Sequence, residues 1–426
     1  MSRPTATVRV FFGTTPSAST LFTLDDSTRG LLDSATYTLG GDTGTDVSAD
    51  VNHIGTSRGR PSLVFDQIDA GTCRIQLNND RSANLGARTY DPFNASGPYY
   101  GLLKPGIRVE VEADGYRIFT GKVSDWNLTF DTSGRSIAEM VCEDALATLA
   151  RKQFDAWTAT SGQTAGARLT DVLNRSEIGW PGGARDLDTG ISTLQGDSIT
   201  WGSNCLNYCQ LVAKSDGPAS FFASRDGLIT FRDRHATLTA PISAVFANDG
   251  TNIPFQQVEV QVGSETYYTR VSVDREGGTA QTYTTTAATT EEIRSLSIGG
   301  LLLDSDAQAL EMATYYANVY ATGDARVSGL TVVAHRQAST GGYGLAVDRL
   351  VNLLQLELND VVTVTFTPNN TGSAINQTCV VSGISHTVTP DLHTVQLKLD
   401  RFDNHAPFIL DDASLGLLDG TSVLAF

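Results

Sequence analysis

Hydrophobic and polar residues alternate along most of this chain, in short runs that end at Gly, Asn or Asp. The runs are rich in Val, Ile, Thr, Tyr and Phe, and a period of two is typical of half-buried β-strands. The pattern therefore predicts a mainly β protein with minor α content. The clearest predicted strands are residues 73–78, 107–112, 116–121, 258–262, 361–366, 378–381 and 394–399.

Helical spacing of apolar residues occurs at fewer places. The clearest predicted helix is 306–321, which Asp304 or Ser305 can cap and Gly323 can end. Shorter helices are predicted at 167–173 and at 204–213, and helical spacing also occurs within 137–151. Ser203 is a candidate N-cap for the second of these. The apolar stripe of the clearest helix consists of Leu310, Ala313, Tyr316, Ala317 and Tyr320.

Two stretches lack a clear period. Residues 179–196 are rich in Gly, Asp and Pro, which predicts a long loop. Residues 277–290 are rich in Thr, and are either a linker or an exposed hairpin, since alternating Thr suits an edge strand.

Length and charge narrow the class of protein. A chain of 426 residues is too long for one ordinary domain and predicts two to four. The net charge is −17, which argues against sequence-specific nucleic-acid binding and against an anionic membrane surface, because both need a basic face. No run approaches the ~18–20 consecutive apolar residues that span a bilayer, so we expect no membrane insertion. The first residues do not resemble a signal peptide.

The five cysteines are scattered and odd in number, which does not fit a disulfide framework. Cys205 and Cys209 are four residues apart, on one face of a predicted helix. A metal site would need further Cys or His nearby, and none is close in sequence. The pattern predicts buried thiols in a protein made in a reducing cytosol.

One internal repeat lies near the two ends of the chain. Residues 24–33 read LDDSTRGLLD and residues 410–419 read LDDASLGLLD, identical at seven of ten positions. The repeat predicts two equivalent docking segments in a pseudo-symmetric assembly. It is alternatively a short turn-helix cap used twice, or a Ca²⁺ site formed by Asp25, Asp26 and Asp33, although the spacing is not that of an EF-hand. The shared residues are Leu24, Asp25, Asp26, Gly30, Leu31, Leu32, Asp33, Leu410, Asp411, Asp412, Gly416, Leu417, Leu418 and Asp419.

Catalytic motifs are nearly absent from the sequence. Residues 55–59 match G-x-S-x-G around Ser57, but a strand-like segment follows where a nucleophile elbow needs a helix. Ser198 lies in a Gly-Asp-Ser tripeptide after a loop. His386 and His393 flank a turn at Pro390, so they can face each other across a hairpin as a packed pair or, alternatively, as metal ligands. We predict no enzyme activity, no cofactor and no metal.

Several blocks resemble the tail-tip (baseplate) hub and minor tail proteins of long-tailed, siphovirus-type bacteriophages. Residues 58–81 read RGRPSLVFDQIDAGTCRIQLNNDR, an order typical of such proteins from phages of actinobacterial hosts. Residues 91–101, DPFNASGPYYG, are similar to a turn of the same group, with a departure at 96–98. Further resemblance covers 103–111, 116–121, 142–146, 306–321, 325–332, 359–364, 380–386, 394–399 and 408–426.

The resemblance implies two hub-type antiparallel β-barrel domains with α+β lateral domains between them. It divides the chain into an N-terminal arm with the first repeat (1–40), a first barrel (41–150) and a lateral α+β domain (151–255). A second lateral domain with the helix 306–321 (256–335), a second barrel (336–403) and a C-terminal arm with the second repeat (404–426) follow.

The resemblance also implies a function. A homotrimeric hub would join the tail tube or distal tail protein and the tape-measure end to receptor-binding, fibre or other minor tail proteins, around the DNA ejection channel. It would belong to the virion, at the tail tip, after assembly in the host cytoplasm. The alternatives are a hexameric distal tail ring protein and, from another class, a tail-associated cell-wall hydrolase or a carbohydrate-binding module.

Overall fold

The computed structural model describes residues 2–12, 44–60, 67–80, 89–132, 136–238, 240–263, 267–285, 292–320, 325–336 and 345–402. Both copies of the repeat, 24–33 and 410–419, lie outside these residues. No helix in the described ranges is long and apolar enough to cross a membrane.

A first barrel is built from antiparallel strands of the N-terminal third. Alternating residues fill its interior, as in β1, where Val8 and Val10 are fully buried. The short strand β2 (Thr45–Asp46) pairs with β1, and the turn η2 (Ser48–Asp50) leads straight into β3, so one segment closes the ring. The ring order is β1 (Ala6–Phe11), β5 (Arg108–Ala113), β6 (Tyr116–Phe130), β7 (Ser136–Glu143), β4 (Asp69–Asn78) and β3 (Val51–Gly59).

A second barrel follows the same plan. Ile253 bridges Phe246 of β15 just before β16 begins, which closes the ring. One pair, β15 with β21, is parallel, and the other pairs are antiparallel. The ring order is β15 (Ile242–Ala247), β21 (Val361–Phe366), β22 (Ile375–Val388), β23 (His393–Arg401), β20 (Arg326–Val333) and β16 (Gln257–Gln261).

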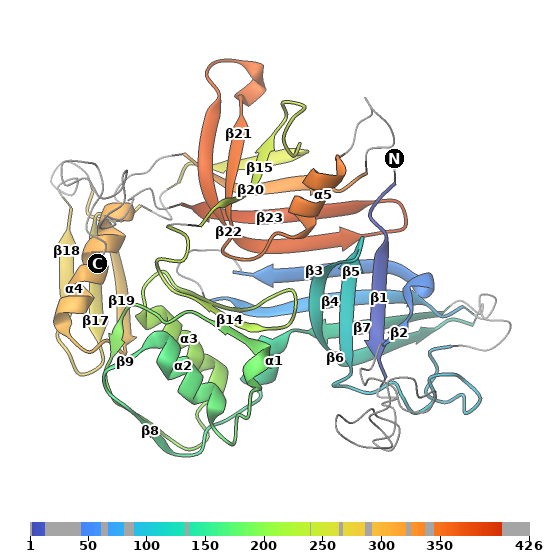
Figure 1. Ribbon diagram of the computed structural model, residues 1–426, viewed down its shortest axis with the longest axis horizontal. Helices are drawn as coiled ribbons and strands as arrows, with labels where there is room; N and C mark the ends of the chain where they lie inside the picture. The colour runs from blue at the N-terminus through green and yellow to red at the C-terminus, as the bar shows by residue number, and fades with distance from the viewer. Residues whose placement is uncertain are drawn as a thin grey trace, which may run out of the picture.

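The two barrels meet through β3 and β22, which pair antiparallel from Gly59 opposite Gly383 to Ile54 opposite Val388. Figure 1 shows these strands side by side where the two barrels meet, so the described strands of both barrels form one continuous sheet. Gly59 has φ +114°, and a Cβ there would lie 2.2 Å from the carbonyl oxygen of Ser382. Only glycine fits this approach.

A lateral unit of helices and short strands packs beside the first barrel. Its fully buried Arg168 donates to the Tyr208 hydroxyl at 3.0 Å and to the backbone oxygens of Thr160 and Gln195 at 2.6 and 2.9 Å, which holds three segments together. The elements are α1 (Ala145–Ala150), β8 (Trp157–Ala159), β9 (Gln163–Thr164), α2 (Ala165–Asn174), η3 (Gly182–Ala184), β10 (Arg185–Leu187), β11 (Thr193–Leu194), β12 (Asp197–Ile199), α3 (Cys205–Ser215), β13 (Ser220–Ala223) and β14 (Ile229–Arg232).

A second lateral unit has its own small core. Helix α4 (Asp306–Val319) packs Met312 and Tyr316 against Val271 and Val273. The helix covers a three-stranded sheet of β17 (Arg270–Arg275), β18 (Gln281–Thr284) and β19 (Ser295–Leu301). The Thr-rich stretch thus supplies an edge strand, β18, as the hairpin alternative predicted. Helix α5 (Val347–Leu354) and the turn η6 (Pro368–Asn370) complete the described elements.

The structure confirms a mainly β fold of two hub-type barrels with α+β lateral units. Strand pairing crosses two predicted boundaries, because β15 from 151–255 and both β16 and β20 from 256–335 belong to the second barrel. Within 137–151 the helical spacing corresponds to α1, capped by Asp144, but 137–143 are not helical. These residues form β7, in which Ala138, Met140 and Cys142 alternate into the core. The N-cap of α3 is Asn204 rather than Ser203.

The predicted histidine pair is present at the joint between the barrels. His386 Nδ1 lies 3.0 Å from His393 Nε2, and the backbone N–H of His386 donates to Thr56 of β3. Burial and the neighbouring His393 hold the pKa of His386 well below its usual value. Burial lowers the pKa of His393 to about 4, helped by Arg3 and His335 and opposed by Asp114.

This pair predicts a loss of stability in acid. Both folded-state pKa values lie below the unfolded value of about 6.5, so the unfolded chain binds protons that the folded chain does not. The free energy of unfolding should therefore fall as pH drops from about 6.5 to about 4. His393→Gln should reduce this loss by about 3 kcal/mol in urea titrations across that range.

Burial raises the pKa of Asp144 to about 7, so protonation of Asp144 stabilises the fold as the pH falls, opposite to the effect of the histidines. This contribution is common to the variant and the wild type, so the difference between their pH slopes reports the histidine pair. The partly exposed His53, on β3, offers the control variant His53→Gln. Equal pH slopes in wild type and His393→Gln would contradict the assignment.

Candidate functional site

The end of β3 carries a buried arginine into the place where both barrels and the first lateral unit meet. Arg58 is 5% exposed, and its Nη1 donates to Glu357 Oε1 at 2.6 Å and to the backbone oxygen of Ala223 at 3.3 Å. Glu357 lies in the turn before β21 and also accepts the backbone N–H of Arg225 at 2.8 Å. One guanidinium group, on a strand of the first barrel, thus contacts both the second barrel and the first lateral unit.

Arg60, two residues later, makes a second set of contacts across the same junction. Its backbone N–H donates to the Ser382 carbonyl at 2.9 Å, and its Nη2 donates to Ser220 Oγ at 3.2 Å. Its Nη1 lies 3.5 Å from Asp400 Oδ2 on β23. Burial raises the pKa of Asp400, and the charge of Arg60 opposes that shift.

A third carboxyl completes the junction on the side of the first barrel. Asp144 caps α1 by accepting the Leu146 N–H at 2.9 Å, and it accepts the Gly71 N–H at 2.6 Å. Burial raises its pKa to about 7, while these backbone hydrogen bonds and the charge of Arg58 act in the opposite direction. Shifted pKa values occur at catalytic sites and in structural ion networks alike. Here each carboxyl has backbone donors or an arginine partner, which fits a structural network.

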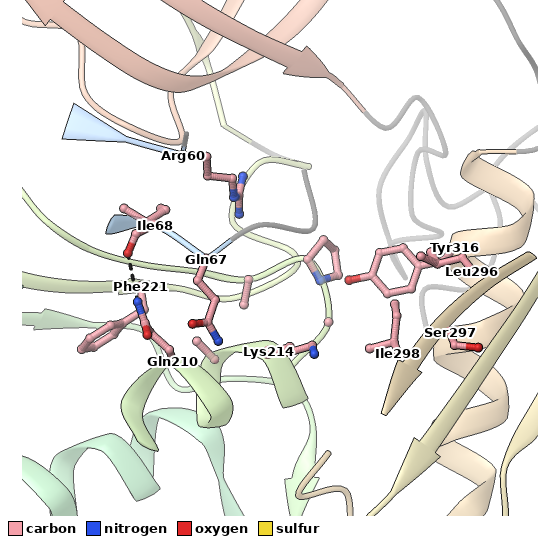
Figure 2. Close-up of a pocket in the computed structure, with 14 residues that line it drawn as sticks. Arg60, Gln67, Ile68, Gln210, Lys214, Phe221, Leu296, Ser297, Ile298 and Tyr316 are labelled. Carbon is pink, nitrogen blue, oxygen red and sulfur yellow. Dashed lines mark hydrogen bonds between the residues drawn. The ribbon is translucent and has the colours of Figure 1, made fainter. Parts of the chain in front are cut away.

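A small cleft lies beside Arg60. Figure 2 shows Tyr316 reaching into it from α4, with Gln210 and Lys214 on α3 beneath. Gln210 Nε2 donates to the Ile68 carbonyl at 3.0 Å. The cleft has a volume of about 140 Å³. Ligand pockets span about 300–1,000 Å³, so this space is too small for a sugar chain or a peptide.

The serine candidates from the sequence do not form a catalytic site. Ser57 lies within β3, and its Oγ is 3.2 Å from that of Ser385 on the paired strand, so no nucleophile elbow exists there. Ser198 lies in β12 opposite Thr158. Among the described residues, no group of three or more His, Cys, Asp or Glu side chains could hold a metal ion.

The cysteine pair and two tryptophans belong to the first lateral unit. Cys205 and Cys209 are both buried, as predicted. Trp180 donates its indole N–H to the Ala184 carbonyl, and Trp201 is 77% exposed on a turn of the lateral unit. All fourteen shared residues of the repeat lie outside the described ranges, so the docking prediction remains a prediction.

Sequence reasoning missed the junction itself. In the sequence, Arg58 and Arg60 stand out only as two arginines on either side of a glycine. Glu357 lies 299 residues away from Arg58. The sequence around an isolated arginine at a strand end does not indicate which carboxylate it will contact.

The junction predicts a large stability effect. Arg58→Ala should lower the free energy of unfolding by about 3 kcal/mol, because the Glu357 carboxylate would lose its buried partner. Arg74→Ala is the control: its Nη1 lies 3.8 Å from Glu139 and its side chain is 64% exposed, so the loss should stay below about 1 kcal/mol. Urea unfolding measures both. Equal losses would show that Arg58 does not tie the two barrels and the first lateral unit together.

Comparison with solved structures identifies proteins of similar fold. A tail protein from Neisseria meningitidis MC58 has a TM-score of 0.59 and 13% identity, over 94% of this chain and 96% of that one. The 43 kDa tail protein of prophage MuSo2 from Shewanella oneidensis has a TM-score of 0.56 and 13% identity, over 94% and 97%.

A third similar structure comes from a secretion system. The c3393 protein of E. coli is a component of the type VI secretion system and is itself structurally similar to the T4 tail proteins gp27 and gp5. It has a TM-score of 0.50 and 10% identity, over 83% of this chain and 74% of that one. No protein-family model and no curated protein sequence matches this chain. At such low identities the likeness concerns the fold, and this chain has the fold of phage tail proteins.

Proposed function

We propose that this protein is the structural hub of a phage tail tip. It would form a homotrimer that joins the tail tube or distal tail protein and the tape-measure end to receptor-binding, fibre or other minor tail proteins. It would surround the DNA ejection channel in the virion. The observation that carries the proposal is the fold shared with two tail proteins over nearly the whole length of each chain.

The joint between the barrels supports a trimer. Two closed barrels are held edge to edge by β3 and β22 within one chain. Three copies would place six barrels in a ring, which matches the pseudo-six-fold arrangement implied by the resemblance to hub proteins. A ring of this kind needs a rigid joint within each chain, and the Arg58 and Arg60 contacts supply one.

An adaptor role without catalysis agrees with the chemistry of the junction. Its buried carboxyls are held by arginines or backbone donors. The sequence resemblance alone supports a siphovirus-type virion and an actinobacterial host, and both are part of the proposal.

The oligomeric state tests the proposal directly. Light scattering of the purified protein should give three times the chain mass of 45.4 kDa, with and without a chelator. Six times the chain mass would favour a distal tail ring instead. A single-chain mass would contradict the trimer and favour a hydrolase or a carbohydrate-binding module. A mass that falls on chelation would indicate that the repeats bind an ion.

The repeats provide a second test. We propose that the first copy belongs with the first barrel and the second copy with the second barrel, and that each copy docks against a neighbouring barrel. A chain that ends at Ile409 lacks the second copy and should assemble more weakly by light scattering. The paired substitutions Ala413→Ser and Leu415→Arg convert variable positions to those of the first copy, and should leave assembly intact. Normal assembly of the shortened chain would contradict the docking role.

A further inference from the structure

The second barrel carries an open apolar groove at one end. Its volume is about 630 Å³, within the range of about 300–1,000 Å³ that holds ligands or peptide segments. One wall is formed by Val258 and Val260 of β16. The other wall is the β21–β22 hairpin, where Phe366 pairs with Ile375. Val260 and Ile375 are 44% and 38% exposed.

The groove also presents a strand edge. β16 pairs with β20 on one side, and along residues 257–260 no strand within the described ranges pairs with its other edge. Closer to β15 that edge is occupied, because the Asn248 side chain donates to and accepts from the backbone of Phe255. From Gln257 onward an extended segment could add to β16 by main-chain hydrogen bonds while its side chains fill the groove.

The few charges that line the groove favour an uncharged segment as its occupant. Of the described lining residues, Asp249 alone is charged, and its carboxylate already accepts the backbone N–H groups of Thr251 and Asn252 at 2.8 Å each. No cation lines the described part of the groove to balance acidic side chains. The repeat at 410–419 has three aspartates and suits this surface poorly. An apolar, uncharged segment suits it well.

Such a segment follows the last strand of the barrel. β23 ends with Arg401 opposite Cys379 of β22, and Ile375 lies four residues further along β22, about 13 Å away at 3.3 Å per residue. The sequence after Phe402 reaches Pro407-Phe408-Ile409 within seven residues. The six residue-to-residue steps from 402 to 408 span up to about 20 Å, which is enough to reach the groove.

We infer that residues 407–409 of the same chain bind this groove as an added strand beside β16, with Phe408 between Val260 and Ile375. The acidic repeat that follows would then leave the barrel from a fixed point, directed at a neighbouring copy. The groove is thus the anchor of the C-terminal arm.

Hydrogen exchange on the full-length protein tests this inference. Amides of 408–410 should exchange at least about tenfold more slowly than in a free peptide of residues 402–412. Val260→Asp should abolish this protection, and so should Ile375→Asp on the opposite wall. Val262→Asp is the matched control, because Val262 is 72% exposed and lies just beyond the groove. It should keep the protection.

Wild-type exchange at the rate of the free peptide would overturn the inference, as would equal loss of protection in Val260→Asp and Val262→Asp. An unchanged unfolding midpoint in each variant shows that the barrel is intact. The exchange reports only on contact between the arm and the groove, so its failure would leave the trimer, which light scattering tests, unaffected.

A cross-link distinguishes the same chain from another copy. In the Ile375→Cys/Phe408→Cys variant, oxidation of a mixture of ¹⁵N-labelled and unlabelled protein should give disulfide-linked peptides of one isotope only. Linked peptides of mixed isotope would assign the groove to the arm of a neighbouring copy and overturn the assignment to the same chain.

Discussion

The pairing of β3 with β22 is the contact on which the rest of the structure depends. It joins strands whose hydrogen-bonded residues, Thr56 and His386, are 330 positions apart. Closing so long a loop costs conformational entropy, and that cost is offset where apolar surface and paired charges are buried together. The glycine at position 59 permits the backbones to approach, and Arg58 and Arg60 then bind the second barrel and the lateral unit from the same strand.

This arrangement determines how the two barrels are held against each other. The buried side chains of both barrels and of the first lateral unit belong to one continuous apolar core, so the joint is part of that core as well as of the sheet. The ionisable groups at the joint are engaged in fixing the angle between the barrels. Buried charge at the joint thus contributes to the fixed placement of one barrel against the other. The fold shared with phage tail proteins gives that geometry a context.

Much of the local structure was predictable, because the signals are local. The run 361–366 coincides with β21, and Ser305 caps α4 as expected, with the helix ending two residues before the predicted position. The pattern of residues 137–143 was ambiguous, because apolar residues at short spacing fit both the helical and the strand period until the neighbouring strands are known. Helix α5 carried a signal that was overlooked, since Leu350, Leu353 and Leu354 follow helical spacing over eight residues.

The sequence by itself determined the class of fold, most of the strands, the buried cysteines and the histidine pair, because each depends on residues close together in the chain. Only the tertiary structure decided which strands share a barrel. A strand pattern specifies a buried face and leaves its hydrogen-bonding edges open to any partner. For the same reason β15 pairs with β21 more than a hundred residues later, β16 and β20 belong to that same barrel, and Arg58 contacts a carboxylate that no spacing rule connects to it.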